Sequence, residues 1–144
     1  DLSADRTFSM PTSTTAVNGF LSATNWTTFN TRTMGFNVFN ATTTATATTT
    51  IQKQLFQAMT ITQITCATNG SSITIGADER ASSTPDTLGT DVFNGGSLSC
   101  TSTGNSTSTF ANATIAGNAI LNFDLDSIPN STTTVRVNIN YKND

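Results

Sequence analysis

Two segments near the C-terminal end of the chain alternate apolar and polar residues at every second position. The first is Leu121–Asp126 (LNFDLD), and the second is Val135–Tyr141 (VRVNINY). Side chains of a β-strand point alternately to opposite faces, so this period of two places the apolar residues of each segment on one face. The two segments are therefore predicted to be strands with one face buried and the other exposed.

The composition of the whole chain also favours strands. Thr and Ser occupy 47 of the 144 positions, Glu occurs once, and 10% of the residues are charged. β-Branched and aromatic side chains fit a pleated sheet, whereas the residues that favour helices are scarce here. Predicted strands recur roughly every 8–12 residues with turns between them. We therefore predict one all-β domain over residues 1–144, an antiparallel β-sandwich with a jelly-roll-like topology.

Two local features are predicted in the middle of the chain. The apolar pattern of Met59–Ile61 resumes one residue out of phase at Ile64, which indicates a β-bulge at Thr62-Gln63. The pair Asn69-Gly70 predicts a tight hairpin turn into a strand over Ile73–Ala77.

The first third of the chain has a weaker strand pattern. Residues 42–50 are expected to form a Thr-rich strand or a linker, and residues 1–15 a strand that can be exchanged with another copy. Large apolar residues in such a segment are typical either of core packing or of a subunit interface. The expected interface residues are Leu2, Phe8 and Met10. Further aromatic residues follow at Phe20, Trp26, Phe29, Phe36, Phe39 and Phe56.

The two cysteines, Cys66 and Cys100, both lie in strand-like segments. We expect a disulfide between neighbouring strands or between two sheets, with two free buried thiols as the alternative. A catalytic cysteine is disfavoured, because the chain has no His to activate a thiol. Two Cys without His also cannot complete a zinc site.

Charge and hydropathy exclude several partners. The net charge is −3, so the chain has little with which to neutralise phosphates, and we expect no nucleic-acid binding. No apolar run of about 20 residues is present, so no membrane-spanning helix is expected. The first residue is Asp1 rather than Met, and Lys is scarce. We therefore expect that a secretory signal or another upstream segment is removed, and that the protein is extracellular.

The chain contains six Asn-x-Ser/Thr sequences, the acceptor pattern for N-linked glycans. About five are expected by chance from the Asn, Ser and Thr content, so the number itself indicates nothing. The best candidates are Asn105 and Asn130, which fall in predicted turns. The others are Asn112, Asn69, Asn25 and Asn40.

The acidic residues offer a weak candidate for a metal site. Asp124 and Asp126 project from one face of a predicted strand, about 7 Å apart, and Ca²⁺ binds carboxylate oxygens. A solvated strand face explains the same pattern, and no other cofactor is expected. Arg80 is expected to form an exposed ion pair with an acidic neighbour, contributing about 0–1 kcal/mol. No catalytic residue stands out, so we expect a protein that is not an enzyme.

Several strand-and-turn segments between residues 61 and 141 carry a resemblance to known proteins. They include ITQITCAT, SSITIGADER, ILNFDLDSI and TTVRVNINY. These segments resemble small β-sandwich proteins of phage virions and of surface fibres from environmental (metagenomic) sequences. The resemblance implies a structural assembly protein and no particular ligand.

The sequence thus predicts a structural subunit of an extracellular homopolymeric filament or fibre, joined by exchange of the N-terminal strand. One alternative is a virion component, either a trimeric fibre or a capsid decoration module. The second alternative is a carbohydrate-binding β-sandwich in which Trp26 or an exposed Phe supports the sugar.

Overall fold

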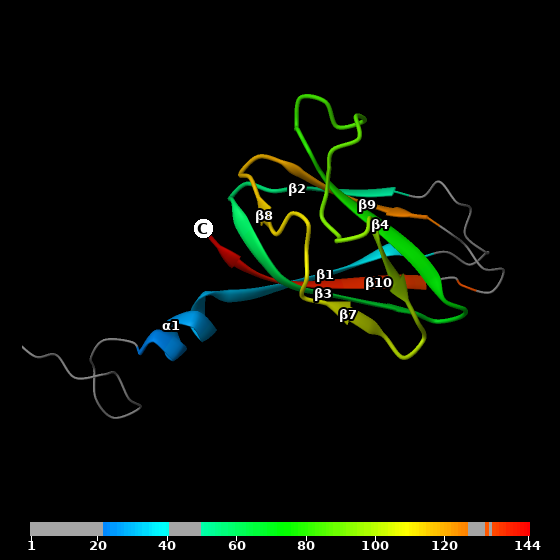
Figure 1. The fold of residues 1–144 in the computed structure, drawn as a ribbon, viewed down its shortest axis with the longest axis horizontal. Coiled ribbons are helices and arrows are strands. Elements are labelled where there is room, and N and C mark those ends of the chain that lie inside the picture. The colour runs from blue at the N-terminus through cyan, green and yellow to red at the C-terminus, as the bar shows by residue number, and fades with distance from the viewer. Residues whose placement is uncertain (1–21, 41–49, 127–131, 133) are drawn as a thin grey trace, which may run out of the picture. The chain divides into compact units, whose positions relative to one another are not determined.

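The computed structural model describes residues 22–40, 50–126, 132 and 134–144, and its strands form two antiparallel sheets packed together (Figure 1). The first sheet has the strand order β1-β10-β3-β7, and β8 also pairs with β3. The second has the order β2-β9-β4-β5, and β6 also pairs with β4. The strands are β1 (Thr31–Asn40), β2 (Thr50–Gln54), β3 (Met59–Thr68), β4 (Ile73–Arg80), β5 (Thr90–Asp91), β6 (Ser97–Cys100), β7 (Asn105–Thr107), β8 (Thr114–Ile115), β9 (Ile120–Leu125) and β10 (Thr134–Asn143).

The order of the strands is that of a jelly roll. Strands β1 to β4 alternate between the two sheets, and the last two strands return to the middle of each sheet. β10 lies between β1 and β3, whereas β9 lies between β2 and β4. The predicted all-β sandwich with jelly-roll-like topology is confirmed.

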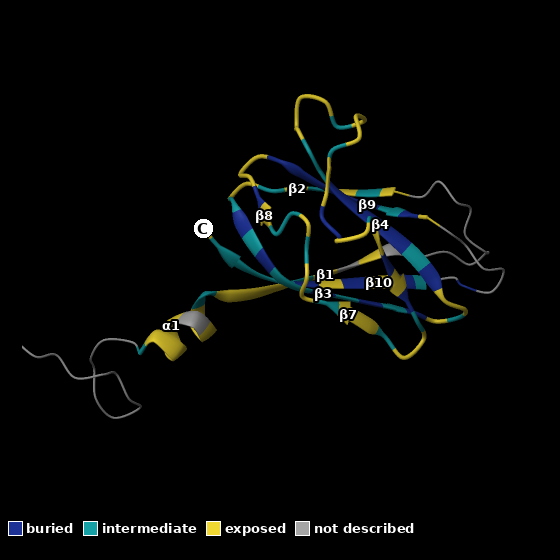
Figure 2. Ribbon diagram, in the orientation of Figure 1, coloured by how far each residue is buried: buried dark blue, intermediate teal, exposed yellow. Residues whose placement is uncertain are grey.

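The core fills the space between the two sheets, as the buried bands along β3, β4, β9 and β10 show (Figure 2). The alternation predicted for β10 is confirmed, since Arg136 and Asn138 are exposed between buried neighbours. On β9, Leu121, Phe123 and Leu125 face the core as predicted, but the opposite face is not exposed, because Asn122 is fully buried. The fully buried residues with the largest side chains are Phe93, Phe123, Ile64, Ile73, Ile75, Ile115, Leu121, Ile139, Val92, Val135 and Val137.

The predicted β-bulge is present on β3. Asn140 of β10 pairs with Gln63, but the next residue, Tyr141, pairs with Ile61, so Thr62 has no partner in the ladder. The extra residue returns Ile61 and Ile64 to the same buried side.

The predicted hairpin between β3 and β4 is wrong. The two strands are consecutive, yet β3 belongs to the first sheet and β4 to the second. Asn69 instead bonds to β10, where its side-chain oxygen accepts a hydrogen bond from the Thr134 N–H at 2.9 Å. β3 and β4 lie in different sheets, and each buries its apolar face in the core between them. This packing outweighs the preference of Asn69-Gly70 for a hairpin turn.

The helix α1 (Ala23–Asn30) was not predicted from the sequence. The chain divides into two units between Thr31 and Arg32, and α1 belongs to the first. Ser22 caps the helix, because its hydroxyl accepts a hydrogen bond from the Asn25 N–H at 3.1 Å. Trp26 and Phe29 are 56% and 60% exposed, and their rings stack at 6.2 Å. These two aromatic residues therefore do not serve core packing within the described part of the chain.

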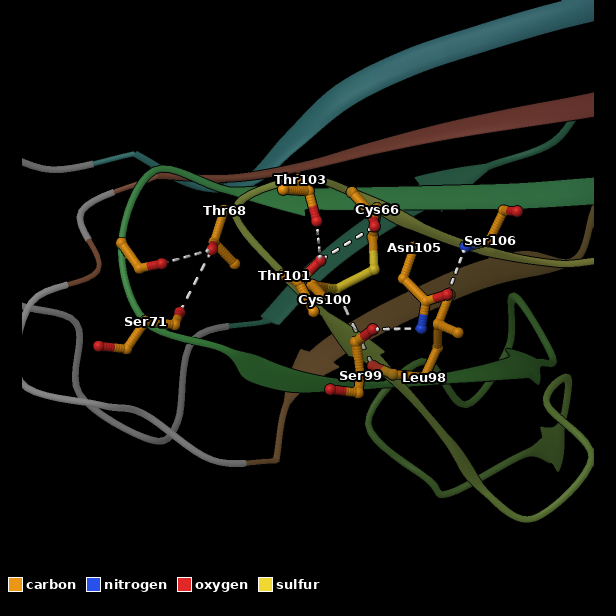
Figure 3. The surroundings of a disulfide bond; sticks show 12 residues. Cys66, Thr68, Ser71, Leu98, Ser99, Cys100, Thr101, Thr103, Asn105 and Ser106 are labelled. Atoms are coloured by element: carbon orange, nitrogen blue, oxygen red, sulfur yellow. Dashed lines mark hydrogen bonds between the residues drawn. A yellow bond between two sulfur atoms is a disulfide. The ribbon is translucent and has the colours of Figure 1, made fainter.

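A disulfide joins Cys66 of β3 to Cys100 of β6 and so links the two sheets (Figure 3). Both cysteines are buried, and their Cα atoms lie 5.2 Å apart. The expected disulfide is confirmed, and the alternative of two free thiols is excluded. Disulfides of this kind are typical of proteins from oxidising compartments.

Removing this disulfide is expected to destabilise the protein. The bond closes a loop between cysteines 34 positions apart, so a double Cys66→Ala, Cys100→Ala variant should lose about 3–4 kcal/mol of unfolding free energy. Urea unfolding of the variant, beside the oxidised and the reduced wild-type chain, measures this loss. An unchanged unfolding midpoint in the variant would show that the cross-link contributes nothing.

Candidate functional site

One long side of the sandwich is sealed by chain segments that cross between the sheets. Val92, directly after β5, accepts hydrogen bonds at its carbonyl from the N–H groups of Ala111 and Asn112 at 2.9 and 3.4 Å. Near β6, the carbonyl of Thr101 accepts one from the Thr68 N–H at 3.0 Å. These bonds tie the edge of the second sheet to the edge of the first.

The side chain of Asn105 adds a further seal at the same side (Figure 3). Its amide donates to the Ser99 carbonyl of β6 at 2.8 Å, and its oxygen accepts from the Ser106 N–H at 2.9 Å. A free strand edge can pair with another chain unless side chains or loops cover it. The short edge strand β6 is therefore covered by groups of its own chain.

No described strand or loop covers the opposite side of the sandwich. Its two edge strands are β1 and β2, and within the described residues β1 pairs only with β10, and β2 only with β9. A hollow of about 270 Å³ lies here, between the first half of β1 and the link from β2 to β3. It is lined by Met34, Gln54, Leu55, Phe56, Gln57, Met59, Tyr141 and Asn143.

The hollow opens onto the hydrophobic core. Met59 belongs to the core, and Met34, Leu55 and Tyr141 pack against it. Phe56 is 84% exposed, which is unusual for so large an apolar side chain. The volume lies below the roughly 300–1,000 Å³ of small-molecule pockets. The hollow therefore fits a few apolar side chains better than a free ligand.

None of the residues that line the hollow carries a charge. A groove of this kind has room for apolar side chains, and one edge of β2 pairs with no strand of the described ranges. Sequence reasoning did not bring these residues together. The one available signal was the apolar pair Leu55-Phe56 between two strands, which breaks the alternation of β2.

A buried polar network lies under the loop of residues 81–89, on the outer face of the second sheet. The carboxylate of Asp78 accepts hydrogen bonds from the Arg80 Nε at 2.6 Å, the Gly89 N–H at 2.8 Å and the Asn122 Nδ2 at 2.8 Å. Asp78 and Asn122 are 2% and 0% exposed. The predicted ion pair of Arg80 with an acidic neighbour is confirmed, but its predicted exposure is wrong, because the two side chains are only 13% and 3% exposed.

Hydrogen bonds keep Asp78 ionised in this site. Burial alone would raise the pKa of Asp78, but the bonds from Arg80, Gly89 and Asn122 together lower it below its ordinary value. Pro85 completes the network, since its carbonyl accepts from the Arg80 Nη1 at 3.0 Å and from the Gln52 Nε2 at 2.9 Å. The network fixes the loop to the sheet, and we assign it a structural role.

The two acidic residues of the weak metal candidate interact with each other. Asp124 is hydrogen-bonded to Asp126, and burial, this bond and the charges of Asp124 and Asp91 raise the pKa of Asp126 to about 6. No group of three or more acidic, His or Cys side chains that could hold a metal ion occurs in the described ranges. Calcium binding at Asp124 and Asp126 stays a prediction.

The raised pKa of Asp126 predicts a fall in stability between about pH 4 and pH 6. A folded-state pKa above the ordinary 3.8 means that the protonated form is favoured by folding. The stabilisation is complete below pH 3.8 and is lost as the pH rises through about 6. Urea unfolding across this range should show the fall, and Asp126→Asn should remove it. A variant with the same pH profile as the wild-type chain would refute the assignment.

The candidate glycan acceptors differ in accessibility. Asn105, Asn69 and Asn25 are exposed, whereas Asn112 is half-buried and its amide donates to Glu79 at 2.6 Å. The amide nitrogen is the atom that carries an N-linked glycan, and it is engaged both in Asn112 and in Asn105, which donates to the Ser99 carbonyl at 2.8 Å. Asn112 is also the one of these four that is half-buried. The side chains of Asn40 and Asn130, like residues 42–49 and the interface residues Leu2, Phe8 and Met10, lie outside the described residues.

Comparison with protein-family models, curated proteins and solved structures returns no match for this chain. Within the described residues, no helix is both long and apolar enough to cross a membrane.

Proposed function

We propose that this protein is a non-enzymatic structural subunit of an extracellular homopolymeric filament. The observation that carries the proposal is the asymmetry of the sandwich, with one side sealed by its own chain and the other open. An unpaired strand edge beside an apolar hollow is the kind of surface that adds a strand from another chain.

The surface chemistry supports the same function. Only 10% of the residues are charged, so electrostatic repulsion between copies is weak. A disulfide between the two sheets suits a protein that works outside the cell, where thiols oxidise. A contact between two different surfaces of identical subunits forms a ring if the rotation between subunits closes. If the rotation does not close, the contact repeats and the assembly grows into a filament.

Negative-stain electron microscopy of the full chain at neutral pH tests the proposal. Long filaments of uniform width are the expected result. Compact particles of fixed size would contradict it and would favour a closed oligomer, such as a trimeric virion module.

A further inference from the structure

The outer edge of β2, which pairs with no other described strand, is the place where a short strand would fit. β2 has five residues, and its partly buried side chains, Ile51 and Lys53, alternate with exposed ones. β2 ends at Gln54, which lines the hollow, and Leu55 and Phe56 follow directly. A strand beside β2 would therefore lie along the backbone edge and place its side chains in the hollow.

The segment Arg6–Met10 (RTFSM), which precedes the described residues, matches this place in length and chemistry. Pro11 follows it, and proline lacks the N–H that a strand ladder needs, so a strand here ends at Met10. Five residues remain between Asp5 and Pro11, as many as in β2.

The side chains of this segment also match the hollow. Phe8 and Met10 are two positions apart, so in a strand they point to the same face, and Arg6 at the start of the segment shares that face. After Arg6, the stretch from Thr7 to Thr15 carries no charge, and neither does the lining of the hollow. Alternate side chains that enter pockets give strand addition its specificity.

We propose that residues 6–10 of one copy add as a strand to the outer edge of β2 in a second copy, with Phe8 and Met10 in the hollow. This inference rests on the proposed function and names its contact. Each copy then has one donor segment and one acceptor edge, and successive copies join head to tail.

Photo-crosslinking of the full chain tests the contact. Phe8 is replaced by the photoreactive p-benzoylphenylalanine, and ¹⁴N- and ¹⁵N-labelled copies are mixed, assembled and irradiated. Mass spectrometry should find position 8 linked to Met34, Tyr141 or residues 54–59, in peptide pairs of mixed isotope. The same photoreactive residue at Leu88, which is 76% exposed on another loop, serves as the control and should not link to the hollow.

A pair of exposed-site variants gives a second measurement. Phe56→Lys places a charge at the rim of the hollow and should raise the critical concentration for assembly at least about tenfold, which is about 1.4 kcal/mol. The matched Leu88→Lys variant should leave it unchanged. Both side chains are exposed, at 84% and 76%, so neither change disturbs the core.

The outcomes separate this inference from the proposed function. The proposed contact is wrong if filaments form but position 8 links to other residues, or links only peptides that carry the same isotope. The filament function would then still stand. The same holds if Phe56→Lys assembles as the wild-type chain does. A chain that forms no filaments before irradiation overturns both.

Discussion

Removal of residues 1–15 is expected to abolish filaments and to leave a folded monomer. The described core lies between Met59 and Ile139, so the deletion removes none of its residues. It removes Phe8 and Met10, the proposed anchors. Electron microscopy, light scattering and circular dichroism together report assembly, mass and fold.

A shorter deletion is the matched control for this experiment. Removal of residues 1–5 takes away Leu2 but keeps the segment Arg6–Met10, and this variant should still form filaments. Filaments that survive the longer deletion would show that the N-terminal segment does not join the subunits.

Substitution of Asp78 by Ala is expected to destabilise the protein by about 3–5 kcal/mol. The change leaves Arg80 and Asn122 without their shared acceptor, and both are largely covered by the loop of residues 81–89. A buried charge that loses its partner is costly, because water cannot replace the lost interaction. Urea unfolding measures the difference in free energy.

Asp86→Asn provides the control, since Asp86 lies in the same loop and is exposed. Its effect should stay within about 0.5 kcal/mol, as for most surface substitutions. An equally small effect of Asp78→Ala would mean that the loop is not held by this carboxylate.

The strands with one clear apolar face were predictable from the sequence. In β9 and β10 the alternation identifies the side chains that face the core, and in β3 the phase shift located the bulge at Thr62. These features depend on near neighbours in the chain, which the sequence displays directly.

The features that depend on distant parts of the chain were not predictable. Asp78 and Asn122 occupy outward positions of their strands, and only the covering loop makes them buried. Asn69-Gly70 has the chemistry of a hairpin turn, but the choice of sheet is decided by the whole core. The hollow brings together residues from β1, β10 and the β2–β3 link, which no local pattern connects.

Helical reconstruction of the assembled protein by cryo-electron microscopy would show the contact between subunits itself. We expect a filament in which neighbouring subunits meet at the side of β1 and β2, with additional strand density beside β2 that continues into the adjacent copy. Discrete particles, or a filament joined through the sealed side of β5 to β8, would contradict it.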